Sequence, residues 1–181
     1  SRGLGDVYKR QGEPCYYVEP LTRAGIVYVF GGGHVSQELV PLLAHVGFSV
    51  AVYEDRERFA DPARFPGAVR TILAPFPEAA ERVAVTRDDY IVIMTRGHQA
   101  DFEVLAQMLR TPATYVGVIG SRHKIAATNA RLLAAGIRET ELARIHTPIG
   151  LPIGAETPAE IAVSIAAELI AHRANAKKEG A

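Results

Sequence analysis

The sequence predicts an α/β domain: a doubly wound, mostly parallel sheet with helices on both faces. Short apolar runs alternate with stretches of helical periodicity along most of the chain, which is the pattern of repeated strand–helix units. Three successive glycines separate the first apolar run from the first helical stretch, as at the turn of a nucleotide-binding unit. Because strands joined through helices run parallel and cross over with one hand, helices should cover both sides of the sheet.

Five strands and their connecting helices are expected, in order along the chain. Each strand is a run rich in β-branched or aromatic residues, and each helix carries apolar residues three and four positions apart. The predicted strands are 26–30, 49–53, 69–73, 90–94 and 114–119. The predicted helices are 34–45, 77–83, 98–109, 122–135, 139–145 and 158–173, with irregular loops at 56–67 and 146–155. The last helix has a strong start, with Thr157 as N-cap, Pro158 at the first position and Glu160 at the third.

Both ends of the chain are expected to lie outside this domain. Residues 1–11 (SRGLGDVYKRQ) resemble a translated sequencing adapter, and 12–25, with two Glu-Pro pairs, should form a linker. On this view the natural protein extends further upstream. The Rossmann-like domain is predicted over 26–173, followed by a polar tail at 174–181.

Composition narrows the classes of partner. The chain has 181 residues, with 20 basic and 20 acidic residues and one cysteine, Cys15. Balanced charge without runs of one sign argues against nucleic acid or an anionic membrane surface as partner. No apolar stretch approaches about 18 residues, so no membrane span is expected. A single cysteine leaves no disulfide framework, which favours a cytoplasmic location.

The stretch from Ile26 to Asp55 has the pattern of a dinucleotide-binding βαβ unit. It contains G-x-G-x-x-S, in which Gly31 permits a tight turn and Gly33 leaves room for a phosphate beside the backbone. The N–H groups and dipole of the following helix attract an anion. Glu54, about 20 residues on, can accept a hydrogen bond from a ribose hydroxyl. The alternative is a unit that kept this shape and binds no ligand.

Polar residues also follow the other predicted strands, at the edge where ligands bind in such sheets. Ser121, Arg122 and Lys124 open a helix, so a hydroxyl, two cations and free N–H groups predict a second anion site. A serine N-cap with solvated basic residues is the alternative. The expected cofactor contacts are Gly31, Gly32, Gly33, His34, Glu54, Arg56, Thr95, His98, Asp101, Gly120, Ser121, Arg122 and Lys124.

Two histidines, His34 and His98, each begin a helix. The helix dipole disfavours a protonated imidazole there, so each could contact a ligand, pass a proton or only cap its helix. A metal site from these histidines and Asp101 is conceivable, but their spacing is not diagnostic, and no metal is expected. No Ser-His-Asp or Cys-His nucleophile signature is present, so no catalytic residue is assigned.

Three motifs resemble one known family. VFGGGHVSQEL at 29–39, VIGSRHK at 118–124 and TPIGLPIGAETPAEIAVSIAAELI at 147–170 closely resemble the C-terminal Rossmann domain of the xanthine dehydrogenase accessory proteins, the XdhC/CoxI family. The resemblance covers about residues 17–173, and its Pro148–Ser164 segment is highly specific. The chain departs from the family pattern twice: Glu54 replaces an aspartate, and the histidine after Thr95 is displaced to position 98.

The resemblance implies a maturation factor for molybdenum hydroxylases, and a cofactor chaperone rather than a turnover enzyme. Such proteins bind the molybdenum cofactor (molybdopterin), favour its sulfurated form and deliver it to the apo-enzyme of a molybdenum hydroxylase. A cysteine desulfurase and a second copy of the chain are further candidate partners. The resemblance also adds Pro148 and Gly150 to the expected cofactor contacts.

Two other functions stay open from the sequence. An NAD(P)-dependent oxidoreductase would use the same crevice, with His34 or His98 as proton donor. A regulatory domain would bind a nucleotide there and signal through an interface.

Overall fold

The computed structural model describes residues 25–120 and 122–179. The expectations for the lead-in at 1–24, including Cys15, and for Ser121 lie outside the described residues, as do those for the side chains of Arg122 and Lys124.

Within the described residues, six parallel strands form one sheet in the order β3-β2-β1-β4-β5-β6. The chain winds outward from β1 to β3, crosses back to β4 beside β1, and winds outward again to β6, which is a doubly wound topology. The strands are β1 Ile26–Phe30, β2 Ser49–Glu54, β3 Arg70–Leu73, β4 Tyr90–Ile93, β5 Tyr115–Val118 and β6 Ile145–His146. The predicted α/β class is confirmed.

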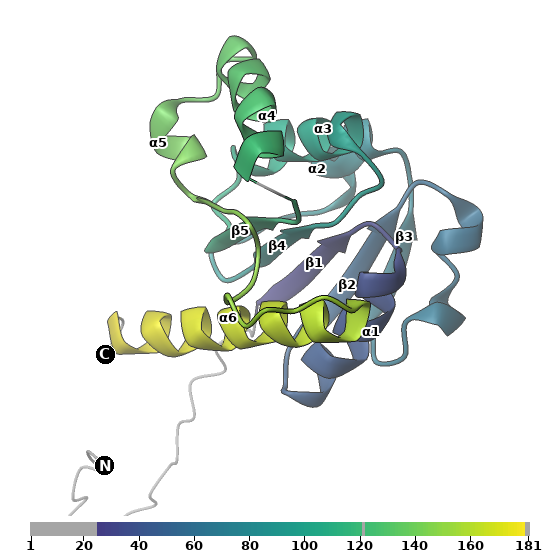
Figure 1. The fold of residues 1–181 in the computed structure, drawn as a ribbon. Helices are drawn as coiled ribbons and strands as arrows, with labels where there is room; N and C mark the ends of the chain where they lie inside the picture. The colour runs from purple at the N-terminus through teal and green to yellow at the C-terminus, as the bar shows by residue number, and fades with distance from the viewer. Residues whose placement is uncertain (1–24, 121, 180–181) are drawn as a thin grey trace, which may run out of the picture.

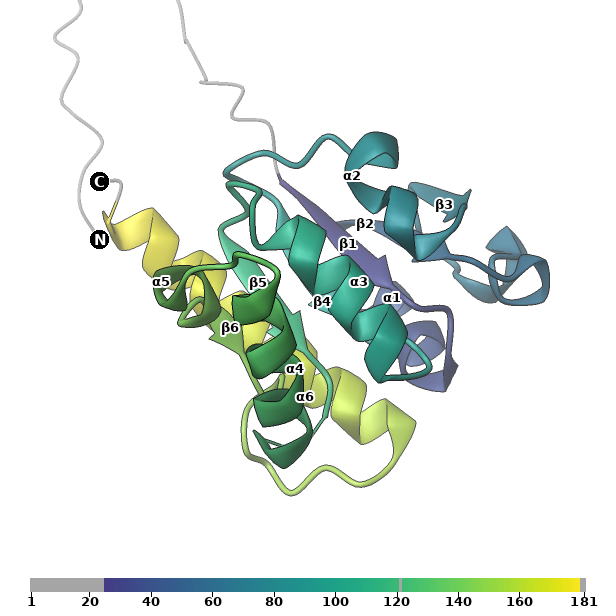
Figure 2. The same ribbon diagram turned by 90° about the horizontal axis from the view of Figure 1, so that it is seen from above.

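Helices cover both faces of the sheet (Figures 1 and 2). Helices α1 and α6 pack against one face, and α2, α3 and α4 pack against the other. The α-helices are α1 His34–His45, α2 Ala79–Arg82, α3 His98–Met108, α4 Arg122–Ala134, α5 Glu139–Leu142 and α6 Pro158–Glu179. Short 3₁₀ turns are η1 Glu57–Phe59, η2 Pro62–Arg64 and η3 Phe76–Glu78.

The two layers of the core follow from strand alternation. On β1, Val27 and Val29 face α1 and α6, whereas Tyr28 and Phe30 face the α2–α4 side, and all four are buried. Because both faces are covered, the central strands are apolar on both sides, as the continuous runs in the sequence predicted.

The structure corrects two element predictions. Residues Ile145–His146 pair with β5 as a sixth strand, where the end of a helix and the start of a loop were expected. A strand of two residues is too short to show alternation. Helix α6 continues to Glu179, whereas a polar tail was expected from Ala174. The stretch 174–179 contains no glycine or proline, and alanine and lysine favour helix.

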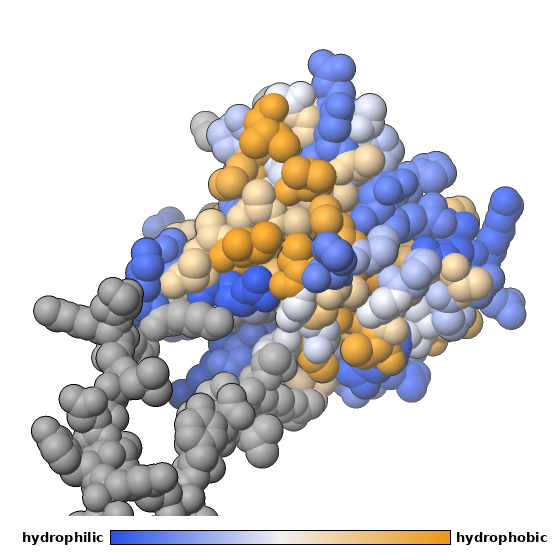
Figure 3. Space-filling view, turned by 90° about the horizontal axis from the view of Figure 1, so that it is seen from below, coloured by the Kyte–Doolittle hydropathy of each residue, from blue (hydrophilic) through white to orange (hydrophobic). Residues whose placement is uncertain are grey.

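The outward side of α6 carries exposed apolar residues. Val163 and Ile170 on the helix, and Leu151 and Ile153 in the loop before it, are between 38% and 54% exposed. Figure 3 shows apolar residues gathered on the face seen from below, where α6 lies. Among the described helices, α6 included, none is long and apolar enough to span a membrane.

Candidate functional site

The carboxyl ends of the central strands meet at one edge, and the winding direction reverses between β1 and β4. Phe30, Ile93 and Val118 end their strands level with one another. The ladder continues one residue further, since the Met94 N–H donates to the Phe30 carbonyl at 2.8 Å and the Ile119 N–H donates to the Ile93 carbonyl at 2.9 Å. Ligands of open α/β sheets bind at such a switch point.

The glycine turn after β1 is fitted tightly to its neighbours. Gly31 has φ +108°, and a Cβ there would lie 2.2 Å from the Met94 carbonyl oxygen, so only glycine fits. The buried Ser36 donates its hydroxyl hydrogen to the Gly31 carbonyl. By contrast, no atom lies within 4 Å of a Cβ placed on Gly33, the N-cap of α1. Helix α1 therefore begins without a side-chain cap, facing open space.

Glu54 ends β2 as a carboxylate that is only 1% exposed. Its Oε2 accepts from the Gly32 N–H at 2.8 Å, and its Oε1 accepts from the N–H groups of Asp55 and Arg56 at 3.1 and 3.2 Å. The Arg56 guanidinium donates to both oxygens, at 2.9 Å to Oε1 and 3.2 Å to Oε2. Glu54, which was expected to accept a hydrogen bond from a ribose hydroxyl, instead links the end of β2 to the glycine turn by hydrogen bonds.

The charge state of Glu54 is set by these donors. Burial raises the pKa of the Glu54 carboxyl, but hydrogen bonds from Arg56, Asp55 and Gly32, with the positive charge of Arg56, outweigh burial and lower the pKa to about 2. The carboxylate is therefore ionised at neutral pH. Its charge is balanced by Arg56, so this pair offers no net positive charge to a phosphate.

A hollow of about 420 Å³ lies between α3 and α4, beyond the ends of β4 and β5. Its volume is within the range of small-molecule sites, and such sites combine an apolar surface with a few polar groups. The apolar lining is Leu105, Val118, Ile119 and Ile125. The polar lining is Thr95, Arg96, His98, Asp101 and Thr128, with the backbone of Gly97 and Gly120.

The backbone of two turns faces this hollow. Among the described atoms, leaving out each glycine's own neighbours in the chain, none lies within 4 Å of a Cβ placed on Gly97, the N-cap of α3, or on Gly120, which has φ +134°. The first turn of α3 is held in place because the Thr95 hydroxyl donates to the Asp101 carboxylate and the Asp101 N–H donates to the Gly97 carbonyl at 3.0 Å. A ligand can approach both glycines closely.

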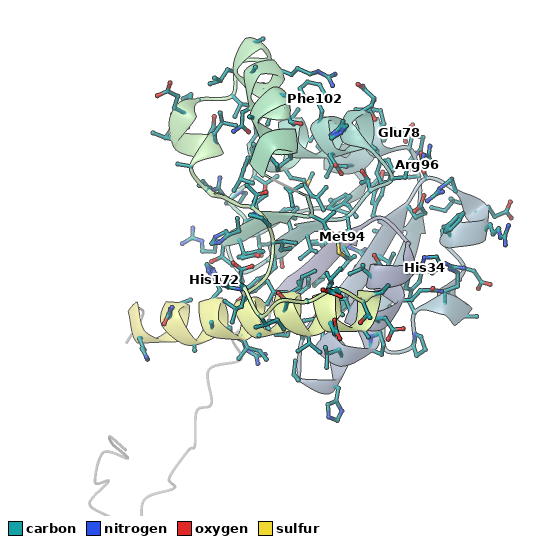
Figure 4. The ribbon with its side chains drawn as sticks, in the orientation of Figure 1. His34, Glu78, Met94, Arg96, Phe102 and His172 are labelled. Carbon is teal, nitrogen blue, oxygen red and sulfur yellow. The ribbon has the colours of Figure 1, made fainter. Side chains whose placement is uncertain are left out.

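Arg96 separates this hollow from a second one, of about 470 Å³, which shares Arg96, Gly97 and His98. The Arg96 guanidinium donates to both carboxylate oxygens of Asp55, at 2.9 and 3.1 Å. The Arg96 side chain is 51% exposed and that of Asp55 is 22% exposed. Figure 4 shows Arg96 on the α3 side of the sheet and His34 beside α1.

The Pro148–Ser164 segment fastens α6 to the sheet. A Cβ on Gly150, which has φ +97°, would lie 2.2 Å from the Ser164 hydroxyl oxygen, and that hydroxyl donates to the Leu151 carbonyl at 2.6 Å. One oxygen of Glu168 accepts from the Gly150 N–H and from the hydroxyl of the buried Tyr115 of β5. Burial, and to a lesser degree the negative charge of Glu168, raises the pKa of the Tyr115 hydroxyl. The hydroxyl therefore stays protonated and can donate its hydrogen.

The chain matches one protein family over most of its described length. The family model for the XdhC Rossmann domain matches residues 27–169. The chain belongs to this family. The resemblance seen in the motifs at 29–39, 118–124 and 147–170 is therefore confirmed.

Relatives of this XdhC domain are longer proteins. The chain is 33% identical over 149 residues to the uncharacterized protein YqeB of Escherichia coli (strain K12). These aligned residues cover 82% of this chain and 27% of YqeB. It is 33% identical over 157 residues to a probable xanthine dehydrogenase subunit of Bacillus subtilis (strain 168), over 86% of the chain and 44% of that protein. A crystal structure of a xanthine dehydrogenase from Bacillus halodurans is similar with a TM-score of 0.72 and 32% identity, over 83% of this chain and 43% of that one. The chain thus spans less than half the length of each.

The XdhC domain brings only some of the predicted contacts together. Four of them line the α3/α4 hollow: Thr95, His98, Asp101 and Gly120. The glycines 31–33 and His34 lie at the start of α1, which covers the opposite face of the sheet from α3, and Glu54 and Arg56 lie at the end of β2. Gly150 has a packing contact with α6. As cofactor contacts, all of these residues and Pro148 stay predictions.

No metal centre is formed by the candidate ligands that the structure describes. His34 and His98 begin helices on opposite faces of the sheet. Among the His, Cys, Asp and Glu side chains that the structure describes, which excludes those of His123 and Glu179, no three come together in a way that could hold a metal ion.

Some lining residues were not singled out from the sequence. Thr128 is a polar residue only 6% exposed, one turn after Ile125 on α4, and both line the hollow. Their spacing of three on a predicted helix places them on one face, which is the signal that could have found them. Leu105 joins them from α3.

Proposed function

We propose that this domain holds the molybdenum cofactor at the carboxyl edge of its sheet for transfer to a molybdenum hydroxylase of the xanthine dehydrogenase type. The observation that carries the proposal is the α3/α4 hollow, where apolar lining, a polar rim and two glycine turns meet. Membership of the XdhC family and the relative named as a probable component of xanthine dehydrogenase support the choice of cofactor.

The residues of the hollow suit a phosphate-bearing pterin. Leu105 and Ile125 offer apolar surface to a flat ring, and Thr128 lines the same wall. The Thr95 hydroxyl, whose hydrogen goes to Asp101, can still accept a hydrogen bond from the edge of the ring. The uncapped N–H groups at the start of α3 suit the phosphate. The molybdenum cofactor would supply a redox-active molybdenum centre to the enzyme that finally receives it.

The proposed role of this chain is to bind the cofactor and then release it. His98 is exposed at the rim, so ligand contacts there exchange readily with water. Favouring the sulfurated form of the cofactor would involve a sulfur donor, for which a cysteine desulfurase is the proposed partner beside the apo-enzyme. We place this exchange in the cytoplasm, and we propose a chaperone function rather than turnover.

Pterin retention tests the proposal. The full protein is purified from cells that make the cofactor and is then oxidised, and the fluorescent pterin released is measured per mole of protein. His98→Ala combined with Thr128→Val should lower the pterin retained per mole of protein at least tenfold. The matched control is His45→Ala, an exposed histidine at the far end of α1, which should retain pterin like the wild type. Equal retention in all three proteins would remove the hollow as the site.

A further inference from the structure

Glu54 has no capacity left for a ribose hydroxyl. An ionised carboxylate offers about four lone-pair positions. Five N–H donors already point at Glu54, from Gly32, Asp55, Arg56 and both ends of the Arg56 guanidinium fork. Because the carboxylate is 1% exposed, a ligand could reach it only after Arg56 moves away.

The space directly against the glycine turn and Glu54 is filled by protein, while the second hollow opens further out, beside Asp55 and Phe76. The Arg56 guanidinium lies over the Phe59 ring, with 3.8 Å between its central carbon and the ring centroid. A Cβ on Gly32 would lie 2.3 Å from the Phe59 carbonyl oxygen, so the η1 turn packs directly on the glycine turn. Arg64 donates to the Gly32 carbonyl at 3.3 Å. In a dinucleotide-binding unit, the adenosine half occupies this side of the crevice.

A second barrier crosses the edge of the sheet. Asp55 follows β2 and Arg96 follows β4, while β1 lies between these strands. Their bidentate ion pair therefore spans the end of β1 on the α3 side. A ligand crossing the end of β1 between β2 and β4 would have to displace this pair, although the second hollow lies beside it, lined by Asp55, Phe76 and Arg96.

We infer that Glu54, Arg56 and Phe59 form a plug that determines ligand class by closing the ribose position in the adenosine half of the crevice. We name these three residues the β2 plug. The ligand is then held by the β4–β5 half alone and is a compact phosphate-bearing heterocycle without a second nucleoside. This ligand class rests on the proposed function, whereas the closure of the ribose position does not.

Titration calorimetry with ADP-ribose tests the β2 plug on the full chain. The wild type should show no binding up to about 1 mM. Arg56→Ala frees lone pairs on Glu54 for the ribose diol, so it should bind ADP-ribose at least tenfold more tightly than the wild type, about 1.4 kcal/mol. Arg58→Ala, an exposed arginine in the same turn, is the matched control and should behave as the wild type.

Two outcomes would overturn the plug: wild-type binding of ADP-ribose or NAD with a Kd below about 0.1 mM, or an Arg56→Ala protein that binds no better than Arg58→Ala. If Arg56→Ala does not fold, Arg56→Lys replaces it. A lysine ammonium cannot bridge both oxygens as a guanidinium fork does, so a gain of at least threefold is expected, and no gain refutes the plug.

A parallel titration with an oxidised, metal-free pterin phosphate separates the two proposals. Pterin binding without ADP-ribose binding supports both. If neither compound binds the wild type but Arg56→Ala gains ADP-ribose binding, the plug stands and the proposed cofactor site fails. Displacement of bound pterin by ADP-ribose in the wild type would refute the plug.

Discussion

Replacing Glu54 with glutamine tests whether one buried carboxylate stabilises the whole ligand edge. Its pKa is lowered from an ordinary 4.5 to about 2, which corresponds to roughly 3 kcal/mol of folding free energy. Because glutamine resembles the protonated acid, Glu54→Gln should be about 3 kcal/mol less stable than the wild type at pH 7. A domain of this size is typically stable by about 5–15 kcal/mol, so the variant should still fold.

The pH dependence gives the sharper test. A lowered pKa in the folded state means that the stabilisation is complete above about pH 4.5 and is lost as the pH falls toward 2. Urea unfolding followed by circular dichroism at pH 7, 5, 4, 3 and 2.5 should therefore show the gap between wild type and Glu54→Gln closing to about 1 kcal/mol at pH 2.5. Glu57→Gln, at an exposed acid of the same loop, is the control and should follow the wild type. Parallel curves for Glu54→Gln and wild type would refute this account.

Two further predictions concern the same edge. Gly32→Ala should lower the free energy of unfolding by about 1–3 kcal/mol, because the new Cβ would lie 2.3 Å from the Phe59 carbonyl oxygen. Gly33→Ala, with open space at that position, should change it by less than about 0.5 kcal/mol. Thermal unfolding compares the two variants, and equal losses of stability would contradict the packing argument. A double-mutant cycle with Asp55→Asn and Arg96→Gln should give a coupling energy below about 1 kcal/mol that shrinks in about 1 M NaCl, since both side chains reach solvent. A coupling that salt leaves unchanged would show that the pair is shielded from water.

Local patterns were sufficient to predict most of the fold. Helix α1 begins and ends where the sequence indicated, and β1 has the predicted bounds. The strand is a continuous apolar run, the helix has apolar residues at helical spacing, and three glycines separate them. Helix α6 was correctly started at Pro158 from its N-cap signals, but its end was missed. Strand β6 gives no local signal, since two residues become a strand only through their partners on β5.

The chemistry at the edge depends on contacts between distant segments, and these were harder to predict. The sequence places an acid at the end of β2, but whether Glu54 faces a ligand or the chain depends on how the loop of Arg56 and Phe59 folds back over Gly32. The hollow similarly requires α3 and α4 to pack beside each other. Spacing puts Thr128 and Ile125 on one face of α4, but only the packing of α3 turns that face into the wall of a hollow.

The contacts of Gly150 change how similarity in the Pro148–Ser164 segment should be interpreted. Gly150, Ser164 and Glu168 hold the last helix against β5. The helix has to be anchored in this way whatever ligand the domain carries. A search based on this stretch therefore sorts proteins by how their last helix is anchored. The α3 and α4 positions that line the hollow are the better place to compare relatives when the question is their ligand.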